Sequence, residues 1–341
     1  MVRLTTLILA ALPLAALATS HSQETVRRKR QHRHVSRLQS RASSYTLQEK
    51  YQGQSFFDNF NFFTGNDPTN GQVNYLSQTD ATNAGIAFVQ SDNTTVLAVD
   101  NTSQLASGAK RNSVRISSKK TFSKGLFIAD FYAMPHGCGV WPAWWSSADP
   151  WPVAGEIDVI EGVNNQLFNQ YTLHTDDGCT LDNNPPTTDG LAAFSANILG
   201  TQCASGAGSN AGCAFSDTRN TSFGEGFNRL AGGVYAHEWT NSSIKMWHFQ
   251  RNEIPADITS GNPDPSTWPT PAAFWSSATC DISSHFYNHA LTLDITLCGD
   301  WANGAYASSG CPGTCSDAVA NPSNFNYAKW KVNYIAVYQQ S

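Results

Sequence analysis

The chain has 341 residues, of which 14% are charged and 11% are aromatic, and its formal net charge at pH 7 is −5. Much of the positive charge lies between residues 24 and 41, so the remainder is clearly acidic. Nucleic acids and anionic lipids attract basic surfaces. We therefore expect neither nucleic acid nor a membrane to be a partner of the mature form.

The first 18 residues are typical of a signal peptide. Arg3 provides a positive start, an apolar run extends from Leu4 to Leu17, and small residues end the segment at Ala18. An uncleaved membrane anchor is the alternative, but a spanning helix needs roughly 20 apolar residues. The pattern favours secretion to the cell exterior or the cell wall.

Residues 19–42 are rich in basic side chains, with Arg27-Arg28-Lys29-Arg30 as the densest group. Such a segment buries too little apolar surface to fold. An arm that binds nucleic acid is one interpretation, and a basic propeptide or disordered linker is the interpretation that suits an exported chain. The rest, residues 43–341, is expected to form one catalytic domain, since no Pro/Ser-rich linker divides it.

Short runs of alternating apolar and polar residues, separated by Gly, Asn, Asp and Pro, predict β-strands. The clearest runs cover residues 113–117, 125–134, 244–250, 290–298 and 330–338. Residues 257–271 and 302–323 are predicted to be long surface loops, and no segment has the periodicity of a long helix. The expected fold is all-β, a concanavalin-like sandwich of jelly-roll type.

Eight cysteines in an exported chain favour disulfides over metal binding. Cys203 and Cys213 flank a loop of small residues and could close it, whereas the other pairings are not deducible. Sequons for N-glycosylation begin at Asn93, Asn101, Asn220 and Asn241, which suits a secreted glycoprotein.

Three acids occur in six residues at Glu156-Ile-Asp158-Val-Ile-Glu161. Strand alternation puts Glu156 and Asp158 on one face, and a β-bulge near Val159 and Ile160 would bring Glu161 to that face as well. Like charges on one face repel, so a chemical role explains them better than a structural one. An exposed acidic strand and a calcium site are the alternatives.

Aromatic residues surround these acids along the chain. We expect Trp141 and Trp151 to be flat platforms for sugar rings, while adjacent Trp144 and Trp145 must point to opposite faces of a strand. His174 lies in the next predicted strand, at residues 171–175, where it could face the acids.

Five segments together closely resemble glycoside hydrolase family 16, in particular fungal laminarinase-like endo-β-1,3(4)-glucanases. They are GCGVWPAWW (137–145), GEIDVIEGVNN (155–165), YTLHT (171–175), GGVYAHEW (232–239) and WKVNYIAVY (330–338). The resemblance covers nearly all of residues 43–341.

The resemblance implies roles for individual residues. Glu156 matches the nucleophile, Asp158 the assisting acid and Glu161 the general acid/base, and His174 matches a histidine close to the catalytic pair. Trp141, Trp151 and Trp301 resemble substrate-binding residues. The chain also has an extra residue between Asp158 and Glu161, and in this it resembles family members that cleave 1,3-linkages.

The predicted function is secreted retaining hydrolysis of internal linkages in 1,3-containing β-glucans such as laminarin and mixed-linkage glucan, by a monomer. No cofactor and no catalytic metal are expected, although the family admits a structural calcium ion whose ligands the sequence does not identify. The alternatives are a cell-wall β-glucan transglycosylase, which would use the same residues, and a non-catalytic β-glucan-binding module, which should lack one or both glutamates.

Overall fold

The computed structural model describes residues 45–185, 192–206 and 209–340. The predicted signal peptide (1–18) and basic segment (19–42) lie outside these ranges. Among the described residues, none of the helices combines the length and apolarity needed to cross a bilayer.

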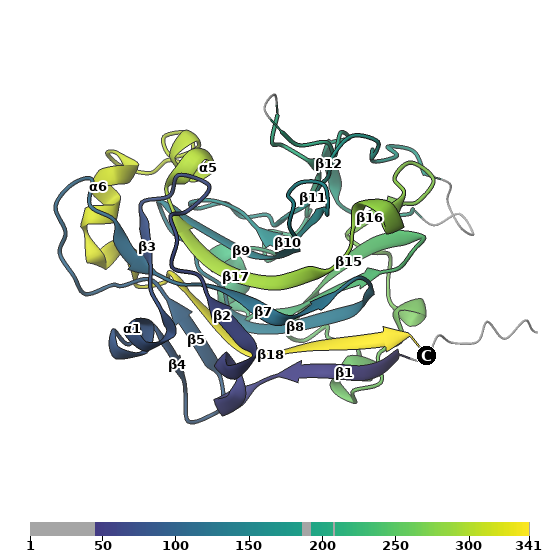
Figure 1. Ribbon diagram of the computed structural model, residues 1–341, viewed down its shortest axis with the longest axis horizontal. Helices are drawn as coiled ribbons and strands as arrows, with labels where there is room; N and C mark the ends of the chain where they lie inside the picture. Colours follow the sequence, from purple (N-terminus) through teal and green to yellow (C-terminus); the bar gives the residue numbers. More distant parts are fainter. Residues whose placement is uncertain (1–44, 186–191, 207–208, 341) are drawn as a thin grey trace, which may run out of the picture. The chain divides into compact units, whose positions relative to one another are not determined.

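Two eight-stranded antiparallel sheets form the framework (Figure 1). The first sheet runs β16 (Ala273–Ser276), β15 (Ser243–Gln250), β14 (Gly233–Trp239), β8 (Gly125–Ala133), β18 (Lys329–Gln340), β5 (Thr95–Ala98) and β4 (Ala87–Val89), with β1 (Tyr45–Tyr51) also paired to β18. The second runs β12 (Asn197–Gly200), β13 (Cys213–Ser216), β11 (Gln170–His174), β10 (Glu156–Glu161), β9 (Val140–Ser147), β17 (His289–Leu297), β7 (Arg115–Phe122) and β2 (Phe60–Phe62). A short parallel pair joins β3 (Val73–Tyr75) to β6 (Arg111–Ser113).

The core lies between the two sheets, because alternate side chains of each strand point to the facing sheet. Phe131 on β8 packs against both Trp144 on β9 and Trp330 on β18, with ring centroids 6.2 and 5.0 Å apart. Ile157 and Ile160 of β10 belong to the same buried cluster. The jelly-roll sandwich is confirmed, and four of the predicted strands correspond to β8, β15, β17 and β18. The predicted strand 113–117 is instead divided at Val114 between β6 and β7.

The helices are short, and the longest of those described have six residues. They are α1 (Gln78–Asn83), α2 (Gly224–Arg229), α3 (Ala256–Thr259), α4 (Ile282–His285), α5 (Gly299–Gly304) and α6 (Cys315–Ala320), with 3₁₀ turns η1 (Gly53–Ser55), η2 (Phe57–Asn59), η3 (Pro265–Thr267) and η4 (Pro322–Phe325).

The two regions predicted to be irregular, 257–271 and 302–323, therefore contain helical turns. The loops were predicted from the many Gly, Pro and Ser residues of these regions, whereas the turns are set by their caps. Asp264, Thr314 and Asn321 accept hydrogen bonds from the backbone N–H groups of Ser266, Asp317 and Ser323. Asp, Thr and Asn favour loops and helix N-caps for the same reason, which is their ability to bind the nearby backbone.

All eight cysteines are paired, as the even count predicted. The local pair Cys203–Cys213 is present, and the other three disulfides are Cys138–Cys311, Cys179–Cys280 and Cys298–Cys315. Cys138–Cys311 and Cys298–Cys315 both tie the segment around α5 and α6 to the strands beside it.

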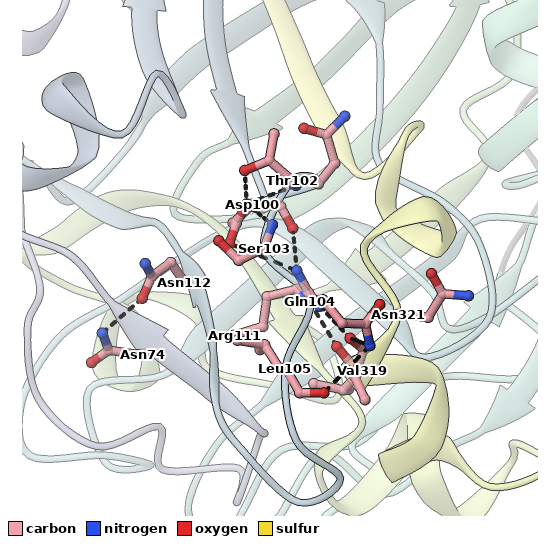
Figure 2. Close-up of polar contacts among 12 residues, drawn as sticks. Asn74, Asp100, Thr102, Ser103, Gln104, Leu105, Arg111, Asn112, Val319 and Asn321 are labelled. Carbon is pink, nitrogen blue, oxygen red and sulfur yellow. Dashed lines mark hydrogen bonds and ion pairs between the residues drawn. The ribbon is translucent and has the colours of Figure 1, made fainter.

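A buried arginine also binds this segment (Figure 2). Arg111 is fully buried, and its guanidinium donates to three carbonyl oxygens, those of Asp100 (2.8 Å), Val319 (2.7 Å) and Ala320 (3.0 Å). The guanidinium also lies 5.0 Å from the ring centroid of Phe325. Arg111 thus joins the turn after β5 to the end of α6.

Replacing Arg111 with methionine is expected to lower the free energy of unfolding by about 3–5 kcal/mol. Methionine keeps much of the apolar stem but removes the donor to the buried carbonyl groups of Asp100 and Val319, and each loss costs about 1–3 kcal/mol before relaxation. The carbonyl of Ala320 still accepts from the backbone N–H of Leu105. Urea unfolding with the disulfides intact measures the change. Arg111→Lys keeps the charge without the planar guanidinium. Its free energy of unfolding should lie between those of the unchanged protein and Arg111→Met. An unchanged midpoint for Arg111→Met would contradict this account.

Candidate active site

The three acids of β10 reach one face because the strand contains a bulge. Glu156 pairs with His174 and Asp158 with Thr172, but Glu161 then pairs with Gln170, so β10 has one residue more than β11 over this stretch. The same shift appears against β9, between Asp158 and Ile160. A bulge inserts one residue into one strand and reverses the facing of the residues after it. The bulge expected from the spacing is present, and Glu156, Asp158 and Glu161 all line one cleft.

Asn169 holds the bulge in place. This residue is fully buried, its amide nitrogen donates to the carbonyl of Val159 at 2.9 Å, and its amide oxygen accepts from the backbone N–H of Glu161 at 3.1 Å. The side chain thereby replaces ladder hydrogen bonds that the extra residue interrupts. The direction of Glu161 therefore depends on a residue eight positions away.

His174 faces the acids across the sheet, as its predicted place in the next strand suggested. Its Nε2 lies 3.3 Å from Oδ2 of Asp158. This is an ion-pair distance without the alignment of a hydrogen bond, and Oδ2 of Asp158 is a buried atom without a hydrogen-bond donor. Polar atoms of Glu156, Asp158 and His174 lie within 4.8 Å of one another.

Each glutamate also accepts a hydrogen bond from a tryptophan. The indole N–H of Trp151 donates to Glu156 at 2.8 Å, and that of Trp141 donates to Glu161 at 2.9 Å. Trp301 packs edge-on against Trp141, with ring centroids 5.5 Å apart. The indoles of Trp141 and Trp151 therefore orient carboxyl groups, in addition to the sugar-stacking role that the sequence predicts for them.

All three predicted tryptophans line the cleft, which has a volume of about 870 Å³. Of the adjacent pair, Trp145 also lines it while Trp144 is buried in the core, in agreement with their expected opposite facing. A cleft of this size with aromatic walls and a polar floor suits a ligand with both CH-rich and hydroxyl-bearing surfaces.

The environment raises the pKa of each of the three acids. Burial, and then the charge of Asp158, raises the pKa of Glu156 to about 8. The same two causes raise the pKa of Glu161 well above its ordinary value, and burial raises that of Asp158. Adjacent carboxyl groups cannot all ionise together, so their protons leave in separate steps. Such a cluster can hold a carboxylate and a carboxylic acid at one pH.

Replacing Trp151 with phenylalanine is expected to move the acidic limb of the activity profile to higher pH. The indole N–H lowers the pKa of Glu156 by stabilising its carboxylate, so its loss raises that pKa further and delays ionisation as pH rises. A shift of up to about one pH unit corresponds to a hydrogen bond of ordinary strength. The pH dependence of kcat/KM measures it, and an unmoved acidic limb with the ring retained would contradict this role.

Two groups among the described residues place three candidate metal ligands together. One contains Cys179 and Cys280, which are joined in a disulfide and so are not ligands. The other is Glu156, Asp158 and His174, and histidine does not belong to the all-oxygen shell that calcium takes. This group does not match the calcium ion that the resemblance admits, and that ion stays an expectation.

Sequence reasoning missed several polar residues of the cleft region. Asn169 and Ser205 bind groups of the acid cluster, and Ser205 lies in a Gly/Ser-rich loop without any distinguishing pattern. Arg115 and Asp294 also line the cleft, and Nη1 of Arg115 lies 3.8 Å from Oδ2 of Asp294. Burial raises the pKa of Asp294 to about 7. A signal existed for Arg115, since strand alternation puts a charged residue opposite the core face of 113–117.

Comparison with known proteins places this geometry in a family. Residues 60–338 match the model described as "XgeA-like, catalytic GH16 domain". A probable glycosidase of Schizosaccharomyces pombe is 42% identical over 88% of this chain and 70% of its own length. An endo-1,3(4)-beta-glucanase of Arthroderma benhamiae is 40% identical over 88% of this chain, and a probable endo-1,3(4)-beta-glucanase of Aspergillus niger is 42% identical over 89%. The chain spans 66% and 41% of the lengths of these two relatives.

Solved structures agree with the sequence relatives. GH16 laminarinase 16A of Phanerochaete chrysosporium, solved with 6-O-glucosyl-laminaritriose in donor and acceptor sites, has a TM-score of 0.81 at 39% identity and covers 87% of this chain and 100% of its own. An elongating GH family 16 β-1,3-glucosyltransferase has a TM-score of 0.80 at 41% identity with the same coverage. The chain belongs to glycoside hydrolase family 16.

Proposed function

We propose that this chain hydrolyses internal linkages of 1,3-containing β-glucans with retention of configuration. The observation that carries the proposal is the placement of Glu156 and Glu161 on the floor of one cleft, brought into phase by the bulge and each bound to an indole N–H. The relatives named endo-1,3(4)-beta-glucanases and the laminarinase with bound glucan support the substrate class.

In the first step, Glu156 attacks the anomeric carbon while Glu161 gives its proton to the leaving oxygen, so that the glycosidic bond breaks and a glycosyl ester forms. In the second step, Glu161 takes a proton from water, which attacks the anomeric carbon and releases Glu156. Asp158 raises the pKa values of Glu156 and Glu161, and His174 lowers them. The raised pKa of Glu161 suits a general acid, and no step needs a metal or a cofactor.

Proton NMR of the first product formed from a laminari-oligosaccharide tests this mechanism. The β-anomer should appear before mutarotation, because two inversions restore the configuration. Initial release of the α-anomer would reject the covalent route. Product profiles on laminarin, lichenan and a cellulose control define the linkages cleaved.

Transglycosylation is a second candidate, favoured by the elongating glucosyltransferase, whose identity and TM-score are close to those of the laminarinase. The same glycosyl-enzyme would then pass to a sugar hydroxyl in place of water. Mass spectrometry of products formed at high oligosaccharide concentration separates the two, since only transfer lengthens the chain. A non-catalytic binding module has no need of two glutamates held by specific hydrogen bonds.

We also propose that the protein is exported and acts as a monomer, with the mature domain beginning near residue 43. Four disulfides support export, because such bonds persist in oxidising compartments. The four sequon asparagines are exposed, as glycan attachment requires. N-terminal sequencing and intact mass of the protein from the culture medium test processing and glycan occupancy.

A further inference from the structure

A serine on a disulfide-closed loop lies behind the histidine of the acid cluster. Ser205 belongs to the loop between Cys203 and Cys213, and its Oγ lies 2.7 Å from Nδ1 of His174. Backbone hydrogen bonds fix this loop to the end of β11, from Thr175 N to Cys203 O (2.9 Å) and from Ser205 N to Thr175 O (2.8 Å). The position of Ser205 is therefore set by the backbone and not by its own side chain.

The loop packs closely against the ring of His174. Gly212, on the far side of the same loop, packs so closely that a Cβ there would lie 2.9 Å from Cε1 of His174 and 2.6 Å from the carbonyl of Leu173. Gly212 also has a φ of +64°, which favours glycine. In this orientation Nδ1 faces Ser205 and Nε2 faces Asp158.

The hydroxyl of Ser205 has two hydrogen-bonding choices. It can donate to Nδ1 of His174, or it can turn toward the carbonyl oxygen of Cys203, 3.3 Å away, and then accept from Nδ1. In the first arrangement a neutral His174 carries its proton on Nε2, toward the carboxylate of Asp158. In the second, Nδ1 carries the proton, and a neutral ring then leaves Nε2 without one. The two arrangements therefore differ in the place of the ring proton as well as in the rotation of the hydroxyl.

We propose that Ser205 is a positioning residue of the active site, which sets the proton of the neutral His174 ring on Nε2, toward Asp158. The proposal rests on the proposed function. The charged groups that act on His174 are Glu156, Asp158 and Glu161, all from β10. In the proposed reaction, Glu156 loses its negative charge on forming the ester while Glu161 gains one. The distribution of charge around His174 therefore changes during the reaction.

Three variants test the proposal. Ser205→Ala removes the hydroxyl and leaves the loop backbone intact. Ser205→Thr returns a hydroxyl to the same position. Ser209→Ala is the matched control, since Ser209 lies in the same loop, is exposed and does not contact His174. Thermal unfolding should be similar for all three variants and the unchanged protein.

Two readouts are needed. Nitrogen-15 NMR of histidine-labelled protein, assigned with His174→Gln, should show His174 with its proton on Nε2 in the unchanged protein and a mixture of tautomers in Ser205→Ala. The value of kcat on laminarin should fall by about tenfold in Ser205→Ala, the equivalent of one ordinary hydrogen bond, with KM unchanged. Ser205→Thr should restore both readouts, and Ser209→Ala should change neither.

Wild-type kcat and an unaltered tautomer in Ser205→Ala would overturn the proposal. So would a fall in kcat that Ser205→Thr does not restore. Failure of the proposed function is a separate result, because it appears as a lack of turnover by the unchanged protein on every β-glucan. In that event the tautomer measurement still decides whether Ser205 sets the proton of His174.

Discussion

Replacing Glu161 with alanine is expected to lower kcat on laminarin by about a thousandfold, within the range that general acid catalysis contributes. The leaving oxygen of a polysaccharide is a poor leaving group without a proton, and Glu161 lines the cleft on the same face as Glu156. Steady-state kinetics on laminarin measure the loss. A decrease of less than tenfold would reject Glu161 as the acid.

A substrate that needs no acid separates the roles of the two glutamates. An aryl β-glucan oligosaccharide with a phenolate of low pKa should form the glycosyl-enzyme in Glu161→Ala, and added azide should then release a β-glycosyl azide, because a small anion enters the space left by the carboxyl group. Glu156→Ala is the control. It lacks the nucleophile, so it should lose activity on both substrates and give no product of retained configuration with azide.

The pH dependence gives an independent check on Glu161. This group must be protonated to act as the acid, so activity falls as pH rises through its raised pKa. The basic limb of kcat/KM should therefore disappear in Glu161→Ala with the aryl substrate. A basic limb that persists unchanged belongs to another group.

The same raised pKa has a consequence for stability. In the folded protein Glu161 keeps its proton over a pH range where the unfolded chain has released it, so stability decreases as pH rises from the ordinary glutamate pKa toward the raised one. Glutamine does not titrate. At neutral pH, Glu161→Gln should therefore unfold at a temperature no lower than that of the unchanged protein. This result would show that loss of activity on replacing Glu161 does not come from unfolding.

The parts of this site that sequence could predict depend on periodicity. Strand alternation puts Glu156 and Asp158 on one face, and the odd spacing to Glu161 requires a bulge if all three are to share it. Alternation also separates Trp144 from Trp145. These inferences depend on residues close together in the chain, where the geometry of one strand fixes the direction of each side chain.

The parts that sequence could not predict depend on contacts between distant segments. Ser205 lies 31 positions after His174, and Arg111 binds carbonyl groups more than 200 residues away. An amide, a hydroxyl or a guanidinium that binds the backbone leaves no periodic pattern. The helical turns at Thr314 and Asn321 were missed for a local reason, since the Gly, Pro and Ser residues around them favour loops and outweighed the caps.

Replacing Asn169 with alanine is expected to lower kcat by at least about a hundredfold, because Glu161 loses the hydrogen bonds that fix its strand. The carbonyl of Val159 and the N–H of Glu161 would both be left unpaired in a buried site, and each costs about 1–3 kcal/mol. The bulge can relieve this by shifting one residue, and a shift of one residue turns Glu161 away from the cleft.

The comparison of kcat with KM distinguishes this effect from general destabilisation. The tryptophans that would contact the sugar lie on β9, on α5 and on the loop before β10, and among them only Trp141 binds Glu161. KM should therefore change much less than kcat. Asn165→Ala is the matched control, because Asn165 is an exposed asparagine in the same connection. A kcat within twofold of the unchanged protein in Asn169→Ala would mean that the neighbouring strands alone hold the bulge. In that case the direction of Glu161 would be a property of the sheet and not of this one amide.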